Sequence, residues 1–225
     1  MSRFTRIQTV LAMQQTGIIP VFYHADPDVC FEVIKACFNG GLKVFEFTNR
    51  GDYAHEVFSE INKRVSRELP QVVLGSGSVM DAPTASLYIQ LGSNFIVSPV
   101  LKEDMAIVCN RRKVLWSPGC GSVTEISKAE ELGAEIVKIF PGSQVGGPEF
   151  VKAVKGPMPW SCIMPTGGVV PDEDNLTEWF KAGVACVGMG SQLITKEIIK
   201  EKNFRLLEDK ARNAFLLLKR IRRKM

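Results

Sequence analysis

The chain has 225 residues, of which 45% are hydrophobic and 23% are charged, and this composition predicts one globular domain over residues 1–225 with a sizeable core. Its net charge of +4 is small and comes partly from a basic run at residues 219–224, which suits the last turn of a helix. No basic stripe with interleaved aromatics occurs elsewhere, so a nucleic-acid partner is not expected. No apolar run reaches membrane-spanning length, the N-terminus lacks the apolar core of a signal peptide, and the six cysteines form no CxxC pair. We therefore expect no membrane contact and a cytoplasmic location.

Strand-like and helix-like segments alternate along the chain. A lead-in helix is predicted first, over residues 5–15, and it ends at Gly17. The strands are predicted at residues 18–23, 43–48, 72–74, 94–97, 114–116, 134–140, 162–164 and 184–187. A helix or helical stretch follows each strand, and the last is a long helix over residues 204–223.

Eight strand–helix units in this length predict an α/β fold, namely a single (β/α)8 TIM barrel with an N-terminal lead-in helix. The alternative is an open doubly wound sheet, which would favour a dinucleotide-binding fingerprint. The stretch from Gly75 to Gly77 lacks the third glycine of that fingerprint, because Met80 stands in its place.

One lysine lies within a predicted apolar strand. Alternation along that strand places Ile136, Lys138 and Phe140 on one face, and Val137 and Ile139 on the other. A lysine there is paired, snorkelling or neutral, because an isolated buried charge is very costly. Desolvation lowers a lysine pKa and frees the lone pair, so Lys138 is a candidate nucleophile. The alternative is an edge-strand lysine that points to water.

A carboxylate lies within the second predicted strand. Val44, Glu46 and Thr48 share one face, which points Glu46 into the barrel. A carboxylate there either works as an acid or base or forms a structural salt bridge with Lys138 or Arg50. Arg50 follows at the strand exit, where its guanidinium could hold a carboxylate or phosphate; the alternative is a solvated loop arginine.

Small and hydroxyl-bearing residues follow most of the other predicted strands, at residues 75–78, 98–99 and 117–119. Such residues let backbone approach a ligand closely. Glycine-rich turns follow the last two strands, at residues 165–168 and 188–191. In barrels this is where backbone N–H groups often bind phosphate.

Metal ligands are poorly supplied. His24 and His55 are the only histidines, no HxH or HExxH motif occurs, and acidic residues do not cluster at strand ends. We therefore expect no metal site, and no Ser-His-Asp triad is evident.

Taken together, the strand ends resemble those of the class I aldolase family that cleaves 2-keto-3-deoxy-6-phosphogluconate (KDPG) and 4-hydroxy-2-oxoglutarate (KHG). The matching pieces occur in the family order and span nearly the whole chain: Ile19-Pro-Val21, Val44-Phe-Glu46-Phe-Thr-Asn-Arg50, Gly75-Ser-Gly-Ser-Val79, Ser98-Pro99, Pro118-Gly119, Lys138-Ile-Phe140-Pro141, Pro165-Thr-Gly-Gly-Val169 and Gly188-Met-Gly-Ser191.

The resemblance implies a trimeric (β/α)8 barrel with Lys138 as the Schiff-base lysine and Glu46 as the acid–base residue. It implies that no metal or organic cofactor is needed, and that the partner is a small 2-keto acid, phosphorylated at its far end, which is cleaved to pyruvate and glyceraldehyde 3-phosphate. It further implies a set of substrate-binding residues: Arg50, Ser78 and Thr166 for the keto-acid carboxylate, Pro99 and Phe140 as walls, and Gly167, Gly168, Gly190 and Ser191 for the phosphate.

Two positions depart from the family pattern. Ser78 stands where many members have threonine, and Gln192 stands where several carry tryptophan. The substrate choice among KDPG, its galactonate epimer and KHG therefore stays open. Two other interpretations also stay open. One is a phosphate-binding barrel of the pentulose-phosphate epimerase or thiamine phosphate synthase kind, which the small number of histidines and the unclustered acidic residues disfavour. The other is a non-catalytic ligand-binding barrel.

Overall fold

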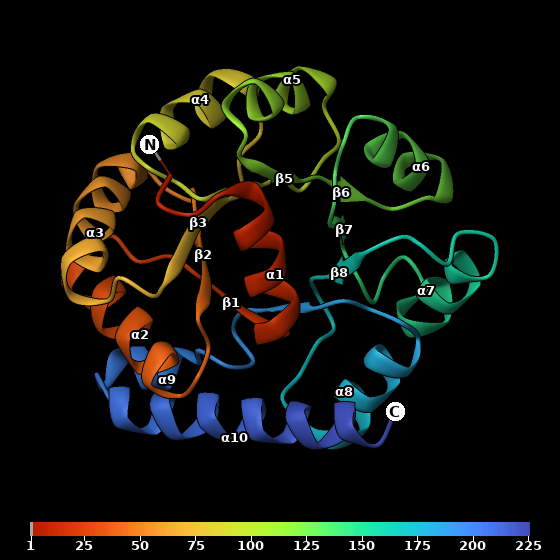
Figure 1. Cartoon of the computed structure of the whole chain (residues 1–225). Helices are drawn as coiled ribbons and strands as arrows, with labels where there is room; N and C mark the ends of the chain where they lie inside the picture. The colour runs from red at the N-terminus through yellow and green to blue at the C-terminus, as the bar shows by residue number, and fades with distance from the viewer. Residues whose placement is uncertain (1) are drawn as a thin grey trace.

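The computed structural model describes residues 2–225, in which helices ring a curled parallel sheet (Figure 1). The strands are β1 Ile18–Phe22, β2 Val44–Thr48, β3 Val73–Gly77, β4 Phe95–Val97, β5 Leu115–Ser117, β6 Gly119–Cys120, β7 Val137–Ile139, β8 Ile163–Pro165 and β9 Val187–Met189. The helices are α1 Arg6–Thr16, α2 Pro27–Asn39, α3 Ala54–Glu68, α4 Ala82–Gln90, α5 Glu103–Arg112, α6 Val123–Glu131, α7 Gly147–Lys155, α8 Glu173–Lys181, α9 Lys196–Lys200 and α10 Phe204–Arg223.

The strands pair in parallel in two sheets. Six form the order β5-β4-β3-β2-β1-β9, and three form the order β6-β7-β8. Only Pro118, which has no N–H to donate to a ladder, separates β5 from β6 along the chain. On the other side, a parallel bridge joins Thr166, just after β8, to Gly188 in β9. The prediction of an α/β fold with a parallel sheet is confirmed, and the curled sheet ringed by helices does not match the open doubly wound alternative.

Alternation along the strands divides the apolar side chains into two cores. Outward-facing residues such as Phe45, Phe47 and Trp116 pack against the helices. The smaller inner core consists of Met13, Ile19, Val44, Val73, Phe95, Val97, Leu115, Ile136, Met164 and Cys186. The predicted alternation in β2, with Val44 inside and both phenylalanines outside, is thus confirmed.

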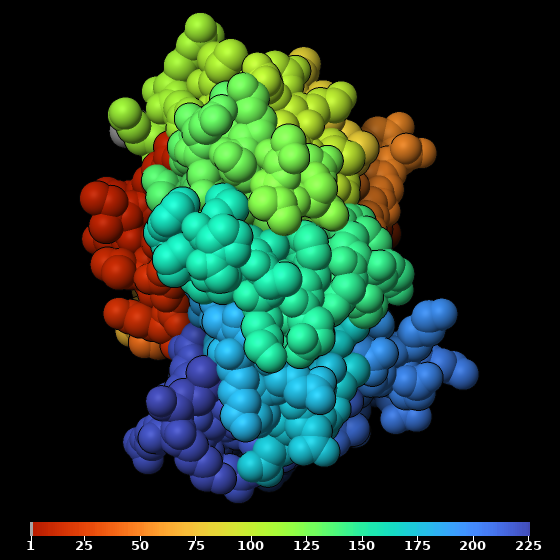
Figure 2. Space-filling model, turned by 90° about the vertical axis from the view of Figure 1, so that its right-hand side faces the viewer, coloured from red at the N-terminus to blue at the C-terminus, as the bar shows by residue number. Residues whose placement is uncertain are grey.

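Helix α1 covers one end of the inner core. Its Met13 is fully buried with the inner strand residues, and it crosses in front of the strands in Figure 1. Thr5 and Gln8 form a capping box at its start, and Gly17 ends it with a φ of 74°. In Figure 2, α1 (red) lies at the left edge, while the segment around α9 protrudes at the right edge. The predicted lead-in helix is therefore present, and it lies at the opposite end of the molecule from α9.

Several boundaries differ from the prediction. Residues 184–187 were predicted as the last strand, but the strand runs Val187–Met189. The third strand continues through both of its glycines to Gly77. Helix α9 was not predicted, whereas α10 spans the predicted residues 204–223. Within residues 2–225, none of the helices has the combination of length and apolarity that a bilayer crossing requires.

Candidate active site

Lys138 lies in the middle of β7 and faces the inside of the curled sheet. Its neighbours Val137 and Ile139 belong to the outer core, whereas Ile136, two residues earlier, belongs to the inner one. Its side chain is only 6% exposed, and its Nζ lies 5.0 Å from the centroid of the Phe140 ring. Burial lowers the pKa of Lys138; the charge of Glu46 opposes this shift and that of Arg50 supports it. The edge-strand alternative is therefore wrong, and Lys138 is a buried amine with a lowered pKa.

Glu46 is the carboxylate that faces this amine. Its Oε1 lies 3.9 Å from Lys138 Nζ, and its side chain is 1% exposed. That distance makes an ionic contact and is too long for a hydrogen bond. The other oxygen, Oε2, is buried without a hydrogen-bond partner. A Cβ at Gly77 would overlap Glu46 Oε1, so the glycine in the neighbouring strand is what leaves room for the carboxylate.

Arg50 and Ser78 lie together at the carboxyl ends of β2 and β3. The Nε of Arg50 donates a hydrogen bond of 3.2 Å to Ser78 Oγ. Ser78 has a φ of 55°, a conformation that serine rarely adopts. The guanidinium itself is exposed, so its remaining N–H groups are available to an anion.

A cavity of about 550 Å³ opens at the carboxyl ends of the strands. Among its lining residues are seven of the predicted substrate-binding residues: Arg50, Phe140, Thr166, Gly167, Gly168, Gly190 and Ser191. Thr166 Oγ1 is buried there without a hydrogen-bond partner, and a Cβ at Gly188 would overlap it. Gly167 and Gly168 have φ values of 98° and 78°, which glycine adopts without strain. Arg50 and Lys196 are the charged residues in the lining, so the cavity favours an anionic ligand.

The remaining predicted residues are not in this lining. Lys138 and Glu46 are buried among the inner strand residues, Ser78 is tied to Arg50, and Pro99 packs against Gly119, where a Cβ would overlap its carbonyl. Sequence reasoning missed Tyr23 and Lys196 as lining residues. Tyr23 directly follows β1, and that position was the available signal; Lys196 lies on the unpredicted helix α9.

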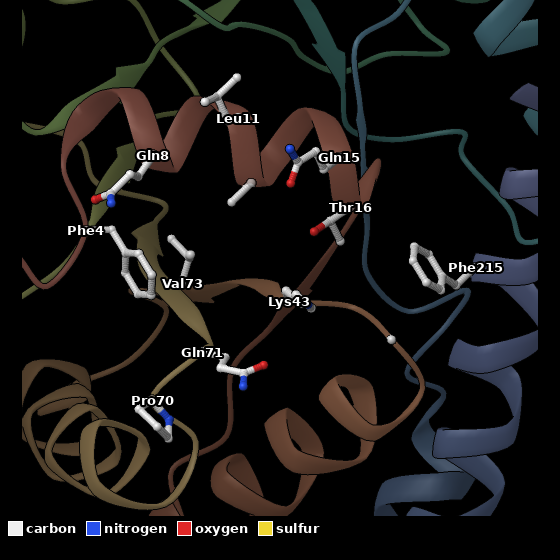
Figure 3. A pocket seen from close by; sticks show the side chains of 12 residues that line it. Phe4, Gln8, Leu11, Gln15, Thr16, Lys43, Pro70, Gln71, Val73 and Phe215 are labelled. Atoms are coloured by element: carbon white, nitrogen blue, oxygen red, sulfur yellow. The ribbon is translucent and has the colours of Figure 1, made fainter.

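A second cavity, of about 590 Å³, lies between α1 and the amino-terminal ends of the strands (Figure 3). Gln8, Leu11, Gln15 and Thr16 of α1 line it on one side. Lys43 is its charged residue, and it contains no carboxylate to pair with a nucleophile or a base. Residues 2–225 also contain no cluster of three histidine, cysteine or acidic side chains suited to a metal ion. The second cavity therefore has no counterpart of the buried pair of Lys138 and Glu46.

A curled parallel sheet whose inner face carries a buried lysine beside a glutamate has the groups that nucleophilic catalysis by an amine requires. The family model described as KDPG and KHG aldolase matches residues 9–209, and the chain belongs to that aldolase family.

Individual relatives agree with this assignment. The chain is 31% identical over 210 residues to the 2-dehydro-3-deoxy-phosphogluconate aldolase of Pseudomonas aeruginosa, covering 93% of this chain and 91% of that one. It is 34% identical over 128 residues to the 2-dehydro-3-deoxy-6-phosphogalactonate aldolase of Escherichia coli, covering 55% and 59%. Its structure is similar to that of a KDPG aldolase from Legionella pneumophila, in which pyruvate was captured as a covalent carbinolamine. The TM-score is 0.83 at 26% identity, over 92% of this chain and 98% of the other.

Proposed function

We propose that this protein is a class I aldolase that cleaves 2-keto-3-deoxy-6-phosphogluconate to pyruvate and glyceraldehyde 3-phosphate. The observation that carries the proposal is the buried amine of Lys138, 3.9 Å from the Glu46 carboxylate, with its pKa lowered by burial. A lysine of lowered pKa has the free lone pair that imine formation requires.

The first step is attack by neutral Lys138 on the ketone carbon of the bound 2-keto acid. A carbinolamine forms, and loss of its hydroxyl as water gives a protonated imine. This iminium accepts the electron pair of the C3–C4 bond when that bond breaks, leaving an enamine of pyruvate. Protonation of the enamine and hydrolysis return pyruvate and the free amine.

Glu46 moves the protons of these steps. Cleavage needs a base for the C4 hydroxyl proton, and carbinolamine dehydration needs an acid. One buried carboxylate beside the amine can serve both, directly or through a water. The ionic contact with Lys138 does not exclude this role, because the carboxylate is not hydrogen-bonded to the amine at 3.9 Å.

Arg50, Ser78 and Thr166 hold the keto-acid carboxylate. Arg50 already donates to Ser78, and Thr166 Oγ1 is buried with no partner of its own. A carboxylate between them would satisfy the threonine hydroxyl and gain a charged donor. Pro99 and Phe140 wall the site and keep water from Lys138, which favours its neutral form.

The phosphate lies at the other end of the cavity. Gly167, Gly168, Gly190 and Ser191 supply backbone and hydroxyl groups there, and Lys196 adds a positive charge. The same cavity could bind the galactonate epimer. It could also bind 4-hydroxy-2-oxoglutarate, which has no phosphate and would gain less binding free energy at this end of the cavity.

We extend the proposal to the architecture. The chain is one domain over residues 1–225, and its strands close into a single (β/α)8 barrel. Support for closure comes from the continuity of β5 and β6 across Pro118 and from the bridge between Thr166 and Gly188. By family resemblance the protein is a cytoplasmic homotrimer.

Borohydride reduction in the presence of pyruvate tests the proposed function. A class I aldolase gains a stable carboxyethyl group on Lys138, because the imine forms from pyruvate with loss of water and borohydride reduces it to a secondary amine, whereas a barrel that only binds ligands gains none. Lys138→Arg is expected to fold, to form no adduct and to lose cleavage, because arginine stays protonated and cannot form the imine. Appreciable cleavage by this variant would show that the Schiff-base mechanism is wrong. Kinetics on the gluconate, galactonate and hydroxy-oxoglutarate substrates then identify the preferred one.

A further inference from the structure

Ser117, at the end of β5, carries a buried hydroxyl that has no hydrogen-bond partner. The residue is 0% exposed, so water outside the protein does not reach it. Two other unpaired polar atoms belong to side chains of the inner face, Glu46 Oε2 and Thr166 Oγ1, and both residues have roles in the proposed reaction. Ser117 has none so far.

Alternation and strand register place Ser117 near Lys138, the amine that Glu46 contacts. Leu115 belongs to the inner core and Trp116 to the outer one, so the side chain of Ser117 faces inward. Gly119 pairs with Lys138 across β6 and β7, and Ser117, two residues earlier, is therefore level with Ile136. Ser117 therefore lies two residues closer than Lys138 to the amino-terminal ends of the strands. It ends β5, which continues across Pro118 into β6, the strand that pairs with β7.

A structural role does not explain this hydroxyl. A buried O–H without a partner destabilises the folded state, whereas an apolar side chain of similar size would pack there without that penalty. The neighbouring inner residues Val97, Leu115 and Ile136 are all apolar. A serine among them makes sense if its hydroxyl has a polar partner when the enzyme works.

We propose that Ser117 is a positioning residue that holds a buried water shared with Glu46. The serine O–H donates to the water, and the water donates to Glu46 Oε2, so that two of the unpaired atoms are satisfied by one molecule. This fixes the carboxylate with Oε1 toward Lys138 and Oε2 toward the water. The inference rests on the acid–base role of Glu46 in the proposed function.

Ser117→Ala removes the hydroxyl with the smallest change in volume. The expected result is a fall in kcat for KDPG cleavage of about twofold to tenfold, the range for a lost hydrogen bond between uncharged groups. KM is expected to change little, because Ser117 does not line the substrate cavity. The thermal midpoint is expected not to fall, because the hydroxyl makes no hydrogen bond within the protein.

Ser76→Ala is the matched control. Ser76 is also a fully buried strand serine, but it faces outward and its hydroxyl donates a hydrogen bond of 3.1 Å to Ser93 Oγ. Ser76→Ala is expected to lower the thermal midpoint, because it removes this hydrogen bond, and to leave kcat near the wild-type value. The two alanine variants should therefore show opposite patterns of stability and turnover.

Three measurements decide the outcome. Borohydride trapping with pyruvate is applied to the wild type first: if no adduct forms, the proposed function fails and this inference falls with it. If the adduct forms and Ser117→Ala keeps wild-type kcat, this inference alone is overturned. A crystal structure of the wild type is expected to show a water within hydrogen-bond distance of both Ser117 Oγ and Glu46 Oε2. Its absence overturns the proposal even if the alanine variant fails to fold.

Discussion

The contact between Lys138 Nζ and Glu46 Oε1 is the feature from which the proposed chemistry follows at the scale of single residues. At 3.9 Å and nearly complete burial, each charge is the other's main electrostatic neighbour. Such a pair is poor support for stability, because desolvation of both groups offsets much of their attraction. Its presence on the inner face of the curled sheet is better explained by function.

Glu46→Gln tests the acid–base role. We expect kcat to fall by about a hundredfold or more, the usual worth of a positioned acid–base group, with pyruvate binding much less affected. The amide also removes the negative charge that raises the pKa of Lys138. That pKa should fall further, so the rate of pyruvate-adduct formation should reach its plateau at a lower pH than in the wild type.

The measurements are kcat for KDPG and the pH dependence of borohydride trapping. The surface variant Glu149→Gln, whose side chain is 85% exposed, serves as the control. A change confined to KM, with kcat intact, would make Glu46 a binding residue instead.

Gly77→Ala tests the space that the carboxylate occupies. The new Cβ would overlap Glu46 Oε1, so the carboxylate must move away from Lys138. We expect kcat to fall by about tenfold or more, because a displacement of about 1 Å in a reacting group can cost a hundredfold. Gly156→Ala is the control, since its Cβ would make an ordinary contact of 3.4 Å. Equal kcat values for the two variants would contradict the inferred position of Glu46.

At the scale of secondary-structure elements, the loops after β8 and β9 line the part of the cavity that is proposed to bind the substrate phosphate. Ser191 lies in the turn after β9 and lines the cavity with Gly167 and Gly168. Lys196, the first residue of α9, brings an ammonium group to the same cavity. A lysine in a first helical turn opposes the helix dipole, so helix stability does not explain its place there.

Ser191→Asp tests this subsite. A carboxylate against the phosphate dianion should cost about 1–3 kcal/mol in kcat/KM for KDPG, the usual worth of a charged hydrogen-bond site. Cleavage of 4-hydroxy-2-oxoglutarate, which has no phosphate, should fall much less. The measurement is the ratio of kcat/KM for the two substrates in wild type and variant. An unchanged ratio, with both activities measurable, would place the phosphate elsewhere.

The elements also show where sequence reasoning succeeds and where it stops. Alternation was enough to predict that Glu46 of β2 faces inward and that Lys138 of β7 shares a face with Ile136, because a period of two is a local property. Sequence reasoning did not predict the bounds of β9 and β3, because both strands contain glycines, whose preference for extended chain is weak. The lining residue Lys196 could not be predicted, because its position depends on how a short helix folds back over the cavity.

At the scale of the whole molecule, the two ends of the strands have different tasks. Helix α1 covers the inner core at one end, and the cavity with the proposed chemistry opens at the other. Arg222 near the end of α10 holds α1 in place: its guanidinium donates to the carbonyls of Gln14, Gln15 and Ala185 and lies 4.8 Å from the centre of the Phe180 ring.

Arg222→Ala is expected to lower the free energy of unfolding by about 1–3 kcal/mol, because it leaves carbonyls at this end without their donor. Arg223→Ala, an exposed neighbour on the same helix, is the control and should change stability little. Chemical denaturation of both variants is the measurement. The kcat of Arg222→Ala under native conditions should stay near wild type, since the residue is at the end opposite the cavity.

The bond from Arg222 to Gln14 spans 208 positions of the chain, and this has a consequence for synthesis on the ribosome. A domain is made from its N-terminus onward, so α1 emerges long before the arginine that holds it. Until α10 has left the exit tunnel, the lead-in helix lacks these contacts, and the apolar residues it covers are less well protected. The nascent chain should therefore be most exposed to chaperones and proteases at this end, and ribosome-bound chains stalled before residue 222 should be cleaved within residues 6–16 more readily than released protein.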